Sequence, residues 1–272
     1  MDDKMLAVYG LRADILNAIG HAEDPPQQLS DAEVITTGLV AMVFCRGNFE
    51  AARALLSMPR YRPHRLSRRR WNRRLHRLTD LVVRLFDLLG CTWKPLKTEA
   101  ISVSDSFPVA VCDHDRMPRA KLYQNKEYRG CMASQKRYFY GLNVHLLVTK
   151  DGQPVECCLT PGSYRDVRIL KAFRCDVPEG SHVYADKAYH DYAMEDVLLE
   201  ASQIQLYPIR QKDSKRVLPP SIASVQHDYR KRIETVGSLI ERMLPKTIHA
   251  VTAEGFELKV FLFVLAYSLN CL

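Results

Sequence analysis

Apolar residues recur at helical spacing through the first third of the chain. The pattern predicts a helix over residues 6–19 and, after a polar break containing two prolines, a second helix that runs to Phe44. Ser30 followed by Glu33 forms a capping box, which marks the start of the second helix. Asn48 predicts the start of a third helix over residues 49–57. We therefore expect an all-helical N-terminal region.

The next predicted helix, over residues 67–89, has two different faces. Its apolar side chains share one side: Trp71, Leu75, Leu78, Val82, Leu85, Phe86 and Leu89. Arginines fill the other side: Arg69, Arg70, Arg73, Arg74 and Arg77. A helical region with such a face is either a DNA-docking domain or a scaffolding layer, and the pattern does not identify a recognition helix.

From residue 100 onward the spacing of apolar residues changes to that of strands, which then alternate with helices. Strands are predicted over residues 101–107, 138–148, 155–159, 182–186 and 204–209, with a hairpin turn at Asp151-Gly152. Helices are predicted over residues 166–173, 192–201, 226–244 and 256–270, and a basic loop over residues 121–136. The fold class is therefore α/β, with a helical domain over residues 1–97 and a second domain over residues 98–272.

Much of the positive charge of the chain is concentrated in one segment. The net charge is +8, and no Asp or Glu interrupts the arginines between Arg60 and Arg77. One alternative is a solvated basic helix face, but so many arginines would repel one another without a polyanion. Because the guanidinium group suits forked contacts to phosphate oxygens, the cluster favours DNA. The DNA-binding candidates here are Arg68, Arg69, Arg70, Arg73, Arg74 and Arg77.

Cysteine usage and hydropathy argue against a zinc-binding protein and against a membrane-spanning protein. The cysteines form no Cys-x-x-Cys pair, so structural zinc is not expected, and they are interpreted as reduced core residues of a cytoplasmic protein. The longest apolar run, residues 260–269, is too short to span a bilayer and predicts a buried helix. No membrane association is expected.

Three carboxylates are candidates for a catalytic site. By its phase in the first strand Asp105 shares a side with apolar residues, which suggests a positive partner such as a metal ion. Asp186 ends a later strand, where ligands of α/β sheets often bind. Glu234 borders the apolar stripe of a late helix, one turn after Arg230. Taken singly, each has a simpler explanation: a turn or cap for the aspartates and a salt-bridged helix face for Glu234.

Together these residues resemble a known family. Ser104-Asp105-Ser106 on a first strand, Asp186-Lys187-Ala188-Tyr189 after a later strand, and Arg230-x-x-x-Glu234 on a late helix resemble the DDE transposases. Within them, the chain is similar to the small bacterial transposases of the insertion sequence 982 type, over essentially its whole length. The resemblance implies an RNase H-like mixed sheet flanked by helices.

The resemblance also implies roles for individual residues. Asp105, Asp186 and Glu234 would be the catalytic residues and ligands of two Mg²⁺ ions, with Mn²⁺ able to substitute. Lys187, Tyr189 and Arg230 would contact DNA phosphates; the alternative is that Lys187 and Arg230 are surface charges and Tyr189 is a core residue. The chain departs from the Tyr–Arg–Glu–Lys signature of some relatives, since His227 stands at the tyrosine position and Glu241 at the lysine position.

The implied function is metal-dependent cleavage at the ends of an insertion sequence and joining of these ends to target DNA. The partners would be double-stranded DNA and a second copy of the chain, in a bacterial, nucleoid-associated setting. Two alternatives remain: a non-catalytic DNA-binding regulator derived from a transposase, and an RNase H-like nuclease that cuts without joining.

Overall fold

The computed structural model describes most of the chain. The described residues are 10, 14, 16, 17, 19–22, 28–58, 61, 66–94, 100–132, 136–164, 169, 173, 177–210 and 214–271. The predicted helices over residues 6–19 and 166–173, and the arginines at 60, 62 and 65, lie largely or wholly outside this set. The chain divides into two compact units, one of residues 1–88 with 242–272 and one of residues 89–241.

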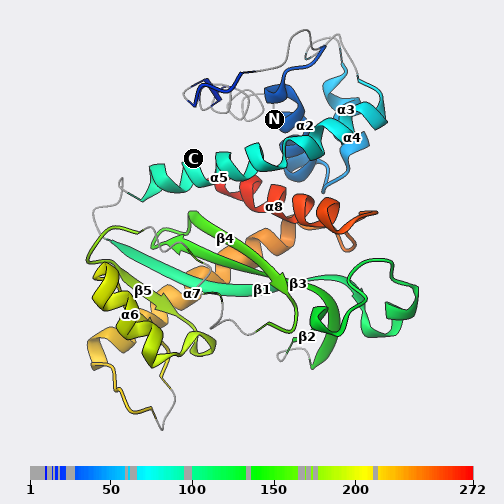
Figure 1. Ribbon diagram of the computed structural model, residues 1–272. Coiled ribbons are helices and arrows are strands. Elements are labelled where there is room, and N and C mark those ends of the chain that lie inside the picture. The colour runs from blue at the N-terminus through cyan, green and yellow to red at the C-terminus, as the bar shows by residue number, and fades with distance from the viewer. Residues whose placement is uncertain are drawn as a thin grey trace. The chain divides into compact units, whose positions relative to one another are not determined.

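The first unit is helical, as the sequence predicts. Its elements are α2 (Asp31–Phe44), α3 (Phe49–Leu56), α4 (Arg68–Arg77), most of α5 (Thr79–Trp93) and α8 (Ala253–Asn270) (Figure 1). The capping box of α2 is confirmed, because the Ser30 hydroxyl accepts from the Glu33 N–H and the Glu33 carboxylate accepts from the Ser30 N–H. Asn48 caps α3 through the N–H of Ala51. The C-terminal helix α8 is buried over most of its length and clusters with the N-terminal helices.

The single helix expected over residues 67–89 is instead two helices. Leu78 separates α4 from α5, and the Thr79 hydroxyl donates to the carbonyl of His76 at 2.8 Å. A threonine that offers a backbone carbonyl a side-chain partner competes with the regular helix ladder, which accounts for the break. The predicted apolar stripe nevertheless continues through the break and is buried: Trp71, Leu75, Leu78, Val82, Leu85, Phe86 and Leu89.

The second unit is built on one mixed sheet. Its strands are β1 (Ile101–Asp113), β2 (Arg129–Met132), β3 (Arg137–Thr149), β4 (Pro154–Pro161), β5 (His182–Ala185) and β6 (Gln205–Pro208). The order is β2-β3-β1-β5-β6, with β4 also paired to β3. β3 runs antiparallel to β1 and β4, whereas β5 runs parallel to both β1 and β6. The expected hairpin turn is present, with Gly152 at φ +91°.

One strand lies where the sequence predicts a loop. The basic segment over residues 121–136 contains a 3-10 helix and the four-residue strand β2. β2 pairs antiparallel with the first residues of β3. Four residues with a mixed burial pattern are too short for alternation of apolar and polar residues to reveal a strand.

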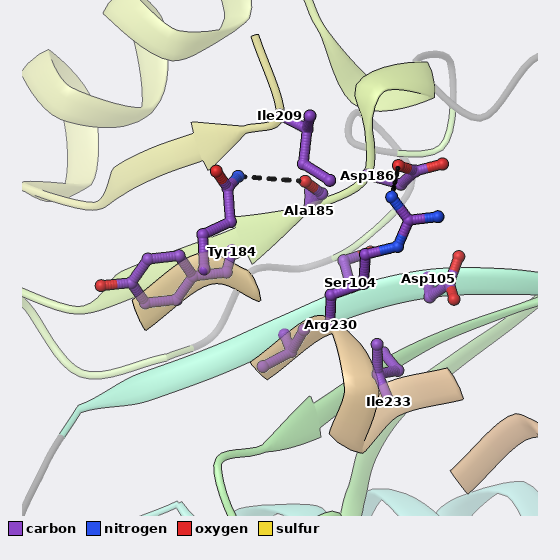
Figure 2. Close-up of a pocket in the computed structure, with 10 residues that line it drawn as sticks. Ser104, Asp105, Tyr184, Ala185, Asp186, Ile209, Arg230 and Ile233 are labelled. Atoms are coloured by element: carbon purple, nitrogen blue, oxygen red, sulfur yellow. Dashed lines mark hydrogen bonds and ion pairs between the residues drawn. The ribbon is translucent and has the colours of Figure 1, made fainter. Parts of the chain in front are cut away.

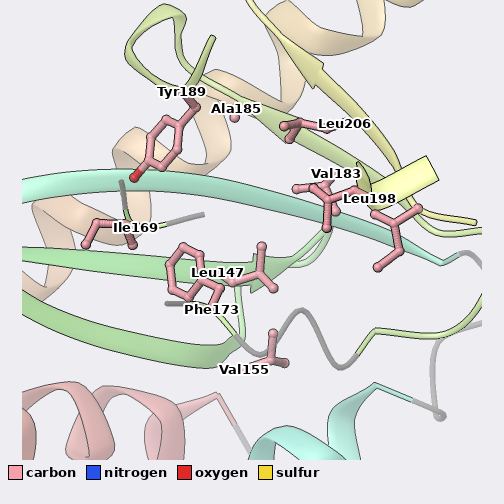
Figure 3. Close-up of a cluster of buried hydrophobic side chains, with 10 residues drawn as sticks. Leu147, Val155, Ile169, Phe173, Val183, Ala185, Tyr189, Leu198 and Leu206 are labelled. Atoms are coloured by element: carbon pink, nitrogen blue, oxygen red, sulfur yellow. The ribbon is translucent and has the colours of Figure 1, made fainter. Parts of the chain in front are cut away.

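Helices cover both faces of the sheet. Val183 and Ala185 of β5 belong to a buried cluster with Leu198 of α6 (Tyr192–Ser202) (Figure 3). Tyr184 lies between them in sequence, so it points to the opposite face, where its ring contacts Tyr229 of α7 (Pro220–Met243). This layout confirms the expected mixed sheet flanked by helices.

The described cysteines form no disulfide with one another. Two of them, Cys91 and Cys131, are exposed and do not belong to the core, which corrects the expectation that all of them are core residues. Among the described residues, no helix is both long enough and apolar enough to cross a membrane.

Candidate active site

Strand register brings two of the three candidate carboxylates together. β1 and β5 run parallel, and Ser104 lies opposite Ala185 at the end of their ladder. The next residues along the chain are Asp105 and Asp186, so the two aspartates lie side by side where the paired segments of the neighbouring strands end. They line one small pocket with Arg230 (Figure 2).

Asp186 sits where the chain leaves the sheet. It follows β5 and precedes the 3-10 turn η5 (Lys187–Tyr189), with extended backbone angles of φ −69° and ψ 167°. Its Oδ1 atom is buried and accepts no hydrogen bond from the described residues. An arginine nitrogen, Nη1 of Arg230, lies 3.4 Å from this oxygen. Because a buried carboxylate oxygen without a hydrogen bond is costly, this atom is suited to receive a cation.

Glu234 is presented by α7, whose buried stripe fixes its orientation. Ile233, Val236 and Ile240 are buried, as the sequence predicts. The side-chain amide of Gln226 also ties the helix to the sheet by donating to the carbonyl of Tyr207 at 2.7 Å. Glu234 borders this stripe and keeps an exposed carboxylate.

Arg230 links the carboxylates electrostatically. Its Nε donates to Oε1 of Glu234 at 2.8 Å, while Nη1 lies 3.4 Å from Asp186. The hydrogen bond to Glu234 raises the pKa of the guanidinium group, and the charges of Asp186, Glu234 and Asp105 raise it further. One cation therefore interacts with all three candidate acids.

A second cavity extends the site along α7. It has a volume of about 340 Å³ and is lined by Asp105, Glu234 and Glu241 among others. Burial raises the pKa of the Glu241 carboxyl. Asp105 lines both cavities, so it is the residue that connects Asp186 on one side with Glu234 on the other.

The donor set suits a hard divalent ion. Asp105, Asp186 and Glu234 offer carboxylate oxygens, which Mg²⁺ prefers, and Asp186 contributes an oxygen that lacks a hydrogen bond. In the part of the chain that the structure describes, no three Asp, Glu, His or Cys side chains are already close enough to hold an ion. Glu234 is hydrogen-bonded to Arg230 instead, through one oxygen of its carboxylate.

The candidate phosphate contacts after Asp186 differ in accessibility. Lys187 is exposed, whereas Tyr189 is fully buried. The Tyr189 hydroxyl lies 3.2 Å from Nδ1 of His145, and Nε2 of His145 lies 2.8 Å from the hydroxyl of Thr160. Tyr189 thus belongs to a core hydrogen-bond network and not to the surface that the sequence predicts for it.

No sequence signal reveals this network, because His145 lies inside an apolar strand and pairs with a tyrosine 44 positions away. Burial lowers the pKa of His145 to about 4, which keeps the imidazole neutral. The network lies on the sheet face opposite Asp105, since its partner in β1 is Ser106. Because Tyr189 belongs to the turn that follows Asp186, the network holds this turn from the face of the sheet opposite Asp105.

The arginines of α4 also differ. Most of the predicted DNA-binding set is exposed on this helix: Arg68, Arg69, Arg70, Arg73 and Arg77. Arg74 is instead half-buried, with Nη2 at 2.6 Å from Asp31 and a further hydrogen bond to the carbonyl of Leu29. Arg74 therefore ties α4 to the start of α2.

Comparison with known proteins identifies a family. Residues 96–249 match the family described as transposase DDE domain. Comparison with curated proteins gives no match. Among solved structures, the Mos1 transposase paired-end complex with left transposon end is 13% identical, with a TM-score of 0.26 over 84% of this chain and 82% of that chain. A pre-cleavage Mos1 transpososome is 16% identical, with a TM-score of 0.23 over 91% of this chain and 79% of that chain.

TM-scores this low do not establish a shared fold, so the assignment depends on the family match. That match covers more than half of the chain and contains all three candidate carboxylates. The strand order and the positions of Asp105, Asp186 and Glu234 come from the structure independently. This chain therefore belongs to the DDE transposase domain family.

Proposed function

We propose that this protein is a DNA transposase that cleaves the ends of an insertion sequence and joins them to target DNA. The observation that carries the proposal is the parallel register of β1 and β5, which places Asp105 beside Asp186 under the helix that presents Glu234. The similarity of its motifs to the insertion sequence 982 type extends the proposal to that subgroup. The solved Mos1 structures include complexes with a transposon end and with Mn.

Asp105, Asp186 and Glu234 would hold two divalent ions, Mg²⁺ or Mn²⁺, and Asp105 is the one of the three that lines both cavities. When bound, such ions supply charge neutralisation at the scissile phosphate and lower the pKa of the attacking oxygen. Arg230 would turn from Glu234 to a phosphate oxygen once the carboxylate is engaged elsewhere. Lys187 would add a second phosphate contact, since it is exposed one residue after Asp186.

DNA binding and catalysis are assigned to the two regions expected from the sequence. Residues 1–97 would bind DNA through the exposed arginines of α4, and the sheet unit within residues 98–272 would carry the chemistry. Joining two ends of an element requires two active sites, so a homodimer on DNA is part of the proposal.

The test compares metal-dependent cleavage and strand transfer on DNA carrying the element's flanking sequences. Wild type is compared with Asp105→Asn, Asp186→Asn and Glu234→Gln, which keep side-chain size but remove the charge. Asp228→Asn is the matched control, because Asp228 is an exposed acid on the same helix as Glu234. Each site variant is expected to lose both reactions and retain DNA binding, whereas the control keeps activity.

Two other outcomes would select the alternatives. Cleavage without joining, abolished by the same variants, would identify a nuclease. DNA binding by wild type without any metal-dependent cleavage would identify a binding protein and remove the catalytic roles of all three carboxylates.

A further inference from the structure

An open cleft lies within the helical unit and contains none of the three carboxylates. Its volume is about 830 Å³, and every residue that lines it belongs to residues 1–88 or 242–272. Three stretches of chain form it: the turn between α2 and α3, one side of α4 as far as His76, and the connection from α7 to α8 together with α8 as far as Phe263. Most of the arginine face of α4 does not contribute to this cleft.

The lining contains more basic than acidic residues. Arg46, Arg68 and Lys259 contribute positive charge, and His76 and His249 add two imidazoles. Arg46 is exposed in the turn after α2, and the Arg68 side chain is 74% exposed. The acid among the lining residues, Glu50, already pairs with Arg53 and lies 3.8 Å from Arg68. The cleft therefore carries a net positive charge that its own carboxylate does not neutralise.

The N-terminal ends of three helices add to the positive electrostatic potential of the cleft. The cleft is lined by the first turns of α3, α4 and α8, which begin after Asn48, Ser67 and Thr252. The first N–H groups of a helix have no partner within the helix, and the helix dipole makes this end favourable for anions. The first turns of α3 and α8 contain Glu50 and Glu254, whereas the first turn of α4 contains no acidic residue to offset this charge.

Lys259 is held in place at the wall of the cleft. Its ammonium group lies 4.7 Å from the centre of the Phe49 ring and donates to the carbonyl of His249. Burial lowers the pKa of this group. An ammonium group fixed by a cation–π contact and one hydrogen bond retains further donors for an anionic ligand.

We propose that this cleft binds the phosphate backbone of DNA. The proposal depends on the proposed function, which makes DNA the substrate, and adds a contact surface beyond the arginine face of α4. Of the six arginines of α4 that the sequence predicts for DNA binding, Arg68 is the one that lines the cleft. With a volume of about 830 Å³, the cleft is much larger than one phosphate ion, which favours a strand over a single phosphate ion. Arg46 and Lys259 are thereby assigned to DNA binding.

The test measures the affinity for double-stranded DNA by fluorescence anisotropy at several salt concentrations. The variants are Arg46→Asn and Lys259→Gln, and the matched control is Arg84→Gln, an exposed arginine of α5 that does not line the cleft. Asparagine suits position 46 because Arg46 has φ +48°, and asparagine adopts positive φ more readily than most residues. Arg46→Asn keeps the test decisive if Lys259→Gln impairs folding.

We expect each cleft variant to weaken DNA binding by about 3- to 10-fold. The slope of log affinity against log salt should fall by about 0.9 for each phosphate that the variant no longer neutralises. The Arg84→Gln control is expected to retain more of the wild-type affinity than either cleft variant. Equal affinities and slopes for Arg46→Asn, Arg84→Gln and wild type would overturn the proposal.

Two further outcomes distinguish DNA from a smaller occupant and from no occupant. Binding of inorganic phosphate or a free nucleotide that Arg46→Asn abolishes, with DNA affinity unchanged, would overturn DNA as the occupant. Failure of the wild-type protein to bind any DNA would overturn the proposed function itself. If the carboxylate variants lose cleavage while the cleft variants bind DNA as tightly as wild type, the proposed function stands and only the proposal for the cleft fails. The two failures are therefore distinguishable.

Discussion

Arg230 is the residue on which the charge of the candidate active site depends. Its guanidinium group is hydrogen-bonded to Glu234 and interacts with the charges of Asp186 and Asp105. A cation in this position lowers the repulsion among three neighbouring acids. It also competes for the carboxylate oxygens that a divalent ion would use.

We predict that Arg230→Gln binds Mg²⁺ more tightly than wild type in the absence of DNA, by about 3- to 10-fold, because the competing charge is removed. Isothermal titration calorimetry measures this affinity directly. Arg232→Gln is the control, since Arg232 lies on the same helix but donates to the carbonyl of Lys150 instead. The same Mg²⁺ affinity in both variants would show that Arg230 does not compete with the ion.

Tyr189 illustrates how a motif residue can have a role other than the one its family suggests. Its hydroxyl is buried against His145, so its removal leaves a buried imidazole nitrogen without this partner. We predict that Tyr189→Phe lowers the free energy of unfolding by about 1–3 kcal/mol, measured by urea denaturation. DNA affinity is expected to stay at the wild-type value. The opposite pattern, normal stability with weakened DNA binding, would restore the phosphate contact that the sequence suggests.

At the scale of elements, α7 has a buried apolar side and presents Glu234 at the edge of that side. Gly237 lies three residues after Glu234, on the wall of the cavity that both residues line. A Cβ atom at Gly237 would meet Phe107 at 3.6 Å, which is an ordinary contact. We predict that Gly237→Ala raises the free energy of unfolding by about 0.5–1 kcal/mol, because alanine is the better helix former. Urea denaturation measures the change.

The contrasting variant is Gly141→Ala in β3. A Cβ atom at this position would lie 2.2 Å from the backbone carbonyl oxygen of Val109, which cannot move away as a flexible side chain would. We expect destabilisation of about 1–3 kcal/mol or more, visible in the same urea titration. A decrease in stability for Gly237→Ala would show that α7 needs glycine for a reason other than helix propensity.

The elements themselves were largely predictable, because long periodic segments such as α7 and β3 carry strong signals. The break at Leu78 and the strand β2 were not, since one depends on a single hydroxyl and the other on pairing with a partner strand. The sequence suggested the three carboxylates and the pairing of Arg230 with Glu234 on one helix face, but not the contact of Arg230 with Asp186. It also missed the His145 network, which only the tertiary fold brings together.

At the scale of the whole molecule, the buried imidazole couples stability to pH. His145 has a pKa of about 4 in the folded chain against an ordinary value of 6.5, and its ring contacts the hydroxyls of Tyr189 and Thr160. The unfolded chain therefore binds a proton between these values that the folded chain does not. The stabilising contribution is present above pH 6.5 and is lost as the pH falls towards 4, up to a value on the order of 3 kcal/mol.

We predict that wild type loses more stability between pH 7 and pH 4.5 than His145→Gln does, measured as free energy of unfolding in urea. The comparison is made between the two pH-dependent losses, so a lower stability of the variant at pH 7 does not affect it. Parallel pH profiles for the two proteins would contradict the assigned neutral state of His145.

The parallel pairing of β1 with β5 has a consequence for how this site can vary in evolution. A strand register changes only in whole residues, and a shift of one residue turns a side chain to the other face. The juxtaposition of Asp105 with Asp186 is therefore kept or lost in a single step and cannot be adjusted gradually. We expect natural variants of this chain to accumulate changes of length in the connections between strands, while the spacing within each strand stays constant.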